Sequence, residues 1–321
     1  MTYEMVKRLG ESIPAGLPNS LRDHGLLVST ATGLYGWGAE LEAVYSGLAN
    51  ALSAEVTGAE PIVLHFPPVL PRAVFEKSEY VSSFPHLFGA VHAFRGDEGA
   101  HESLERAVTK GEDWGGHTRL TDFVLAPAVC YSVYPLFGGT VLDRGRAVDA
   151  SGFCFRHEPS TEPGRLVSFR LREFVRIGSP ADASTWFEEW NERSSAFVRR
   201  LGLKVRVEAA SDPFFGTSGQ VMAENQREEG MKAEVVVPIG DHPVAVASIN
   251  LHRDHFGRIF DIQAADGEPA HSACVGFGLE RLAFALVDAH GPRTSQWPDE
   301  VRESLWGGGP GAPGRGLSGP S

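Results

Sequence analysis

A stretch near the middle of the chain carries residue types that suit a nucleoside triphosphate. It reads FCFRHEPSTEPGRLVSFRLREFVRIG over residues 153–178, and it predicts two strands joined by a turn-forming loop at 159–164. Arg156 and Glu158 lie on the first strand, and Phe169 lies on the second. A guanidinium can hold a phosphate through two parallel hydrogen bonds, and a flat ring can cover a base. This hairpin therefore predicts a nucleotide site.

Glu173 is out of place on the return strand of the hairpin, residues 166–177. The period of two puts it on the side that otherwise carries valine, phenylalanine, leucine and isoleucine. A charge there is costly unless a cation or a hydrogen-bond donor meets it. A neighbouring arginine could form an ion pair with it. Alternatively, Cys130 and Cys274, on or beside predicted strands, could join it around a zinc ion with one open position.

A second motif lies near the carboxyl end, where residues 276–281 read GFGLER. The pattern predicts a short strand, a tight turn at Gly276 and Gly278, and then an apolar helix with Arg281 near its start. The glycines would let the strand and the helix pack closely. The arginine could then face the terminal phosphate of a nucleotide, which makes this motif a partner for the central hairpin.

Together the two motifs resemble motifs 2 and 3 of the class II aminoacyl-tRNA synthetases. The chain as a whole resembles a narrower group, the amino acid:[carrier protein] ligases, relatives of the atypical seryl-tRNA synthetases of methanogenic archaea. This resemblance implies an α+β fold with a class II synthetase-type antiparallel sheet flanked by helices. Besides the hairpin it is carried by FPPVLPR (66–72), FPHLFG (84–89), the segment around Cys130, SDPFFG (211–216) and ACVGFGLERLAFAL (273–286).

The resemblance implies a ligase reaction in two steps. An amino acid and ATP, accompanied by Mg²⁺, give an aminoacyl-adenylate and pyrophosphate. The phosphopantetheine thiol of a small carrier protein then captures the adenylate. In this family Cys, Glu and Cys hold a catalytic zinc, and these match Cys130, Glu173 and Cys274. The metal takes the α-amino group of a small substrate, so glycine or alanine is expected, with serine behind them.

Roles for single residues also follow from the resemblance. Arg156 and Glu158 are expected to act on ATP as catalytic residues, Arg281 to hold its γ-phosphate, and Phe169 to stack on adenine. Glu173 would bind the substrate through the metal. No general base is needed, because the substrate carboxylate attacks as an anion. Further ATP contacts are expected at Arg165, Leu166, Lys232, Ala247, Ser248, Ile249 and Asn250.

Other elements must hold these motifs in place. Apolar spacing predicts a helix at 36–52, and an apolar strand at 61–66 follows it. This pair resembles motif 1 of the class II synthetases, which builds the dimer interface, so a homodimer is expected. A long helix is predicted at 182–201, with Thr185 and Glu188 as its capping box. Further predictions are a helix at 220–231 and strands at 232–239, 243–251 and 258–264.

The composition limits the class of protein. The chain has 321 residues, 42% of them hydrophobic and 22% charged, which are ordinary globular values. A net charge of −12 argues against an extended nucleic-acid surface. Three scattered cysteines and the lack of an apolar signal core predict a cytoplasmic location. Prolines and glycines interrupt the uncharged run at 123–142, which favours buried strand and loop over a membrane span.

One catalytic domain is expected over residues 1–306. Residues 307–321 contain seven glycines and three prolines, a composition typical of disorder. A seryl-type tRNA ligase would need an RNA-binding appendage, for which the motifs leave little room, so tRNA is not an expected partner. A non-catalytic regulatory paralogue would lose catalytic arginines that are present here. The carrier protein is expected to contact the helix at 220–231 or the basic run at 193–206.

Overall fold

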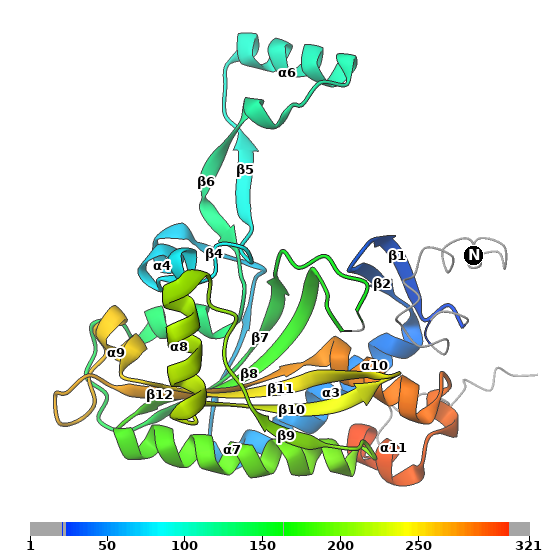
Figure 1. The fold of residues 1–321 in the computed structure, drawn as a ribbon, viewed down its shortest axis with the longest axis vertical. Helices are drawn as coiled ribbons and strands as arrows, with labels where there is room; N and C mark the ends of the chain where they lie inside the picture. The colour runs from blue at the N-terminus through cyan, green and yellow to red at the C-terminus, as the bar shows by residue number, and fades with distance from the viewer. Residues whose placement is uncertain (1–20, 22–23, 163, 308–321) are drawn as a thin grey trace, which may run out of the picture.

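The computed structural model describes residue 21 and residues 24–162 and 164–307 (Figure 1). Within these ranges a seven-stranded sheet with the order β3-β7-β8-β12-β11-β10-β9 forms the centre of the molecule. β3 runs parallel to β7, and the other neighbouring pairs are antiparallel. The strands are β3 (Ile62–Phe66), β7 (Arg146–Phe155), β8 (Ser168–Gly178), β9 (Arg206–Ala209), β10 (Lys232–Ile239), β11 (His242–Arg253) and β12 (His271–Gly278).

Long helices cover one face of this sheet, as the apolar stripes in the sequence predict. They are α3 (Ala39–Val56), α7 (Pro180–Arg200) and α10 (Leu279–His290), and Figure 1 shows α7 lying along the sheet. Their apolar side chains pack against Phe174 of β8 and Phe277 of β12, both fully buried. Burial of large side chains on this face supplies the main stabilising term of the fold. The predicted α+β class, with helices flanking an antiparallel sheet, is confirmed.

The opposite face of the sheet has a second core, built from short elements. Two 3₁₀ turns, Cys130–Ser132 and Tyr134–Phe137, and the helix α9 (His255–Phe260) pack on it. The side chains buried between these elements and the sheet include Cys130, Cys154 and Cys274. All the cysteines of the predicted metal set therefore lie on the same side of the sheet.

A smaller sheet stands beside the main one. It contains β4 (Val69–Pro71), β6 (Thr118–Leu125) and β5 (Ala90–Phe94), in that order, and α4 (Arg72–Lys77) and α5 (Tyr80–Ser83) accompany it. Figure 1 shows β5, β6 and α6 (Glu98–Lys110) projecting away from the rest of the molecule. The remaining elements are β1 (Leu27–Ala31), β2 (Leu34–Trp37), α8 (Gly216–Glu228), α11 (Asp299–Trp306) and the 3₁₀ turns Thr57–Ala59, Gly115–His117 and Thr294–Gln296.

The start of α7 differs from the prediction. Thr185 and Glu188 do not form its capping box, because the N-cap lies six residues earlier than their pattern requires. Ser179 is the N-cap, and its hydroxyl and the Asp182 carboxylate each accept a hydrogen bond from the other residue's backbone N–H, at 3.1 Å. Pro180 at the first helical position has the φ that a helix needs and lacks the N–H that would be unpaired there.

Two other local predictions were wrong. Residues 258–264 are not a strand, because α9 occupies 255–260 and Gly257 packs against the backbone of Ala270, where a Cβ would come within 2.1 Å of its oxygen. Gly276 does not form a turn, since β12 continues through it to Gly278 and α10 follows directly. In both places a tertiary contact outweighs the local pattern.

Two further expectations concern the whole chain. Within the described ranges, no helix is both long and apolar enough to span a bilayer. The run at 123–142 contains the end of β6 and the two 3₁₀ turns, so strand and loop are confirmed there, and its middle part is buried while Phe123, Leu136 and Val141 are exposed. The predicted disordered tail lies outside the described residues, apart from Gly307.

Candidate active site

Cys130, Glu173 and Cys274 come together on the second face of the main sheet. Their sulfur and carboxylate oxygen atoms all lie within 4.8 Å of one another, and all three residues are buried. The register of β8 and β12 explains part of this, because Gly276 lies opposite Glu173 and Cys274 lies two residues before Gly276 on the same face. Cys130 comes from outside the sheet, on the 3₁₀ turn that follows β6.

Glu173 is held by a backbone donor rather than by an arginine. Its Oε2 accepts a hydrogen bond of 2.6 Å from the backbone N–H of Cys130, so the predicted ion-pair alternative does not describe this carboxylate. Burial raises the pKa of Glu173 to about 7, with the nearby Cys274 adding to the shift. A Cβ at Gly276 would stand 3.2 Å from Glu173 Oε1. Glycine at this position leaves room for the carboxylate.

The two thiols of the cluster are electrostatically coupled. A hydrogen bond between them raises the pKa of Cys130 well above the usual value and lowers the pKa of Cys274 well below it. Two sulfurs and one carboxylate oxygen form a donor set that fits zinc, with one coordination position left for another ligand. Cys154 is buried nearby but is not a member of the cluster.

Arg156 and Phe169 meet at the end of the central hairpin. β7 ends at Phe155, and Cys154 lies opposite Phe169 of β8. The Arg156 guanidinium carbon lies 5.4 Å from the centre of the Phe169 ring, and its Nε donates to the carbonyl of Pro127 at 3.1 Å. A cation above a ring is a favourable pair, and it places a phosphate ligand beside a flat apolar surface.

Arg281 faces the same space from the first turn of α10. Its Nε donates to Gly164 O at 2.7 Å and its Nη1 to Ala245 O at 2.8 Å. Burial, followed by the positive charge of Arg156, lowers the pKa of Arg281 to about 10. Gly164 has φ of +77°, and a Cβ there would lie 3.1 Å from Arg281 Cγ. The two neighbouring guanidiniums form a site suited to an anion.

Glu158 and Arg165 pair with each other in the loop of the hairpin. Arg165 Nη1 donates to Glu158 Oε2 at 2.8 Å, while its Nε donates to Glu162 Oε2 at 2.6 Å. Arg165 is half exposed, so these pairs contribute little to stability. Lys232 is buried and pairs with Asp212 at 2.5 Å and with Glu234 at 3.4 Å.

The predicted ATP contacts on β11 divide between the two faces of the sheet. Ser248 and Asn250 lie opposite Gly276 and Cys274, on the face that carries the cluster. Ala247 and Ile249 point the other way, into the helix-covered core, and Leu166 is buried in the same core. The side chains of Ala247, Ile249 and Leu166 therefore lie in the helix-covered core and not beside the cluster.

Most of the sequence aligns with that of a bacterial ligase. Amino acid–[acyl-carrier-protein] ligase 1 of Bradyrhizobium diazoefficiens is 43% identical over 270 residues, which cover 82% of this chain and 83% of that protein. The chain belongs to the amino acid–[acyl-carrier-protein] ligase family. No protein-family model matches this member of the ligase family.

More distant relatives of this ligase-family chain are tRNA ligases. A type-2 serine–tRNA ligase of Methanopyrus kandleri is 26% identical over 292 residues, and the match spans about half of that protein, 55% of its length. The crystal structure of M. kandleri SerRS in complex with Aquifex aeolicus tRNASec has a TM-score of 0.77 at 21% identity, covering 98% of this chain and 68% of that one. The class II synthetase-type fold is therefore confirmed.

The sequence analysis did not predict several residues that lie in the candidate site. His252 lies 3.7 Å from Cys274 Sγ through its Nε2 and 3.2 Å from the Tyr134 hydroxyl through its Nδ1. Asp212 pairs with Lys232. His252 follows Asn250 by two residues, so the strand period placed it on the same face as Asn250 and could have revealed it.

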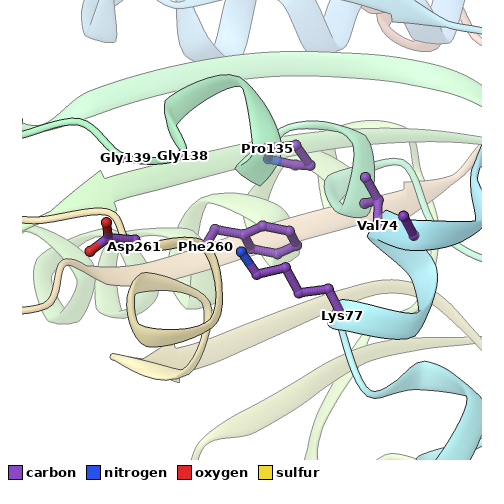
Figure 2. Close-up of a pocket in the computed structure, with 8 residues that line it drawn as sticks. Val74, Lys77, Pro135, Gly138, Gly139, Phe260 and Asp261 are labelled. Carbon is purple, nitrogen blue, oxygen red and sulfur yellow. The ribbon is translucent and has the colours of Figure 1, made fainter.

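One cavity of the protein lies away from the cluster. It has a volume of about 450 Å³, and Figure 2 shows Val74 and Lys77 of α4 on one side, with Pro135 and Phe260 at its wall. Lys77 Nζ lies 5.4 Å from the centre of the Phe260 ring. None of the predicted site residues lines this cavity, so the cluster and the arginine pair define the candidate active site instead.

Proposed function

We propose that this protein activates a small amino acid with ATP and transfers it to the phosphopantetheine thiol of a carrier protein. The observation that carries the proposal is the position of the Cys130–Glu173–Cys274 cluster beside the arginine pair. Arg156 donates to the carbonyl of Pro127, three residues before Cys130, and its guanidinium lies over Phe169, which packs against the core that contains the cluster. The two parts of the site are therefore neighbours. A site for an amine next to a site for phosphates suits the joining of an amino acid to a nucleotide.

The proposed first step forms the adenylate. A carboxylate oxygen of the amino acid attacks the α-phosphorus of ATP, the bond from that phosphorus to the bridging oxygen breaks, and pyrophosphate leaves. Arg156 would hold the α-phosphate and Arg281 the γ-phosphate, while Phe169 stacks on adenine and Glu158 contacts the nucleotide. Positioning and charge neutralisation supply the catalysis. Mg²⁺ would accompany the phosphates.

The proposed second step moves the aminoacyl group to the carrier. The thiolate sulfur of phosphopantetheine attacks the carbonyl carbon, the carbon–oxygen bond to the phosphate breaks, and AMP leaves. Cys130, Glu173 and Cys274 would hold zinc throughout. When bound, zinc would offer its open position to the substrate's α-amino group. The choice of a small amino acid, glycine or alanine, as the substrate comes from the resemblance to the ligase family, since every α-amino acid carries this amine.

We propose that α8 provides the docking surface for the carrier protein. Phe215 at its N-cap and Val221 and Met222 within it are exposed apolar side chains. Gln226 fixes the helix to the site, because its amide accepts from Asp212 N at 2.6 Å and donates to Asp212 Oδ2 at 2.8 Å. A partner bound on α8 would therefore stand next to Asp212 and its ion-pair partner, the buried Lys232.

We also propose that the protein is a cytoplasmic homodimer. The three cysteines are free thiols, as a reducing compartment requires. β3 is an edge strand whose Ile62 and Val63 side chains are exposed. A cavity of about 290 Å³ beside it is lined by α3, β7 and β8 as well. Apolar side chains on an unpaired edge favour contact with a second copy.

Amino-acid-dependent exchange of pyrophosphate into ATP tests the first step. All twenty amino acids are compared, with and without a zinc chelator. We expect exchange with one small amino acid, and we expect the chelator to abolish it. Exchange that the chelator leaves unchanged would contradict the role of zinc, and no exchange from zinc-loaded protein would contradict the proposed activation.

Loading tests the second step and separates the proposal from a tRNA ligase. Phosphopantetheinylated carrier protein and tRNA are offered to the same enzyme with the activated amino acid. Mass spectrometry of the carrier should show one added aminoacyl group for each phosphopantetheine, and the tRNA should stay uncharged. Charging of tRNA with no carrier loading would favour the seryl-tRNA ligase relatives as the better guide to function.

A further inference from the structure

His252 links the two cysteine-bearing segments of the candidate active site. It lies on β11, half-buried, two residues after Asn250. Its Nε2 is 3.7 Å from Cys274 Sγ, and its Nδ1 is 3.2 Å from the Tyr134 hydroxyl. Ser272 Oγ, at 3.4 Å, is a weaker neighbour of the same Nδ1. The ring therefore has a polar partner at both nitrogens.

A thiolate at Cys274 determines which atom carries the hydrogen between Cys274 and His252. A thiolate that binds a metal carries no hydrogen, so the hydrogen between Cys274 and His252 must be on Nε2. A neutral imidazole then accepts at Nδ1, and the Tyr134 hydroxyl is the donor that meets it. The Tyr134 O–H thus donates to His252 Nδ1, and the His252 Nε2–H donates to the Cys274 sulfur.

Tyr134 is held rigidly at one end of this row of hydrogen bonds. Its side chain is fully buried and its ring stacks on Phe256 with ring centres 4.0 Å apart. Tyr134 lies on the 3₁₀ turn directly after the one that carries Cys130. Since Cys130 is outside the sheet, strand pairing does not fix its distance from Cys274. The bond from Cys130 N to Glu173 is one link, and the Tyr134–His252–Cys274 chain is the second.

His252 is not a member of the ligand cluster itself. Within the described ranges, the donor atoms that lie within 4.8 Å of one another belong to Cys130, Glu173 and Cys274. Metal-bound side chains commonly have such outer hydrogen-bond partners, which orient the ligand atoms. Asn250 Nδ2, at 3.8 Å, is another donor to the Cys274 sulfur. Loss of His252 would thus remove one of the two nitrogen donors that the described residues offer to this sulfur.

We propose that His252 is a positioning residue of the metal centre, which orients the Cys274 thiolate by donating from Nε2 while Tyr134 fixes the ring at Nδ1. The inference rests on the zinc site of the proposed function. It goes beyond that function by assigning a role to a residue outside the ligand set. The readout is therefore the affinity for zinc, measured in the absence of ATP and amino acid.

The test compares His252→Phe with His252→Gln. Phenylalanine keeps a planar ring and removes both nitrogens, whereas glutamine keeps an N–H donor near the position of Nε2. Metal-free protein is titrated with zinc against a chromophoric chelator, and cobalt is then added to record the sulfur-to-cobalt absorption bands. We expect His252→Phe to bind zinc about 10- to 100-fold more weakly, with altered cobalt bands. His252→Gln should recover most of the affinity.

His255→Phe is the matched control, because His255 lies on the neighbouring helix and contacts Phe256 rather than Cys274. It should bind zinc like the wild type. Tyr134→Phe removes one hydroxyl and keeps the stacked ring, so a smaller loss in the same direction is expected, and it carries the test if His252→Phe fails to fold. Thermal midpoints of the metal-free proteins establish folding.

Distinct results separate failure of this inference from failure of the metal centre. If the wild type binds zinc and folded His252→Phe binds it equally well, the role of His252 is overturned. If Tyr134→Phe also has wild-type affinity, the hydrogen bonds from Tyr134 through His252 to Cys274 have no function at the metal. A wild type that takes up no zinc would overturn both the metal centre and His252's role in it.

Discussion

Among the single residues, the candidate site depends on two guanidinium groups, one at the end of β7 and one in the first turn of α10. Arg156 and Arg281 are half-buried, and the charge of one lowers the pKa of the other. Two N–H groups of Arg281 donate to backbone carbonyls, and these hydrogen bonds fix the orientation of its guanidinium before a ligand binds. An anion between the two arginines would relieve their repulsion. Preorganised charge of this kind is what stabilises phosphoryl groups during transfer.

Arg156→Ala should therefore lower the rate of ATP–pyrophosphate exchange by about 10²- to 10³-fold, the usual cost of removing one such donor. Arg165→Ala should cost less, because Arg165 is half exposed and already paired with Glu158 and Glu162. Initial exchange rates at saturating amino acid measure both. A larger loss in Arg165→Ala than in Arg156→Ala, with both variants folded, would contradict the assignment.

At the scale of elements, α7 begins with a cap that depends on ionisation. Burial alone would raise the pKa of Asp182, but hydrogen bonds from Arg176 and Ser179 outweigh it and hold the pKa below its usual value. The native state therefore favours the charged form more than the unfolded chain does. This contribution is present above the unfolded pKa and is lost as the pH falls through the folded pKa.

Asp182→Asn should lower the free energy of unfolding by about 1 kcal/mol at pH 7, a typical value for a cap. The difference from the wild type should stay constant from pH 8 to pH 5 and shrink below about pH 4, where the unfolded carboxyl begins to protonate. Urea unfolding at each pH measures this. If the difference in the free energy of unfolding between wild type and Asp182→Asn grows as the pH falls, the assigned role of the Asp182 carboxylate is contradicted.

A second element, α8, combines an exposed apolar face with a tether to the site. Because Gln226 holds both the backbone and the carboxylate of Asp212, the position of α8 is tied to the position of Lys232. Val221 and Met222 face solvent on the same helix. This arrangement lets docking on α8 be disrupted while adenylate formation is left in place.

Val221→Asp and Met222→Asp should each lower carrier loading at least about tenfold, equivalent to about 1.4 kcal/mol of binding, and leave pyrophosphate exchange unchanged. The double variant Arg199→Glu with Arg200→Glu tests the basic run at 193–206 in the same assay. Loading that depends on the arginines and ignores α8 would move the docking surface to the end of α7.

At the scale of the whole molecule, the two edges of the main sheet differ. β3 and β9 are its edge strands, and each carries an exposed valine, Val63 at 55% and Val207 at 46%. β3 also lies beside the cavity lined by α3, whereas β9 is a short strand at the far edge. The resemblance of α3 and β3 to motif 1 predicts that β3 is the edge used for dimerisation.

Val63→Lys should weaken dimerisation at least tenfold, about 1.4 kcal/mol, because a lysine in an apolar contact must lose its hydration. Val207→Lys is the control at the other edge and should sediment like the wild type. Sedimentation velocity over a concentration series measures both. A monomeric wild type, or dissociation only in Val207→Lys, would contradict the assigned interface.

Residues 1–306 are proposed to act as one catalytic domain, because the candidate site draws on elements from β6 to α10. Cys130 follows β6, the hairpin supplies Glu173 and Arg156, and Arg281 comes from α10. The main sheet itself begins with β3, which precedes all of them. The cluster and the arginine pair lie within residues 130–281, and β3 and α3 before them complete the sheet and its helical cover.

The amino-acid sequence was enough to predict the strands of the central hairpin, β10, β11, and the helices α3, α7 and α10, and it was enough to predict the residue types of the site. Periods of two and 3.6 identify β10, β11 and α7 because each face of these elements meets one environment. The odd carboxylate at Glu173 and the arginines of the two motifs were recognisable for the same reason. Local patterns failed where a distant contact decides the backbone, as Ala270 does at Gly257.

Only the tertiary structure decided that Cys130, Glu173 and Cys274 meet. Cys130 and Glu173 are 43 residues apart, and chain spacing does not specify which strands become neighbours. The register of β8 against β12 places Glu173 beside Cys274, and a hydrogen bond from a turn outside the sheet brings in Cys130. The same three-dimensional pairing placed Ala247 and Ile249 behind the sheet and His252 against Cys274, because side-chain direction depends on register as well as residue type.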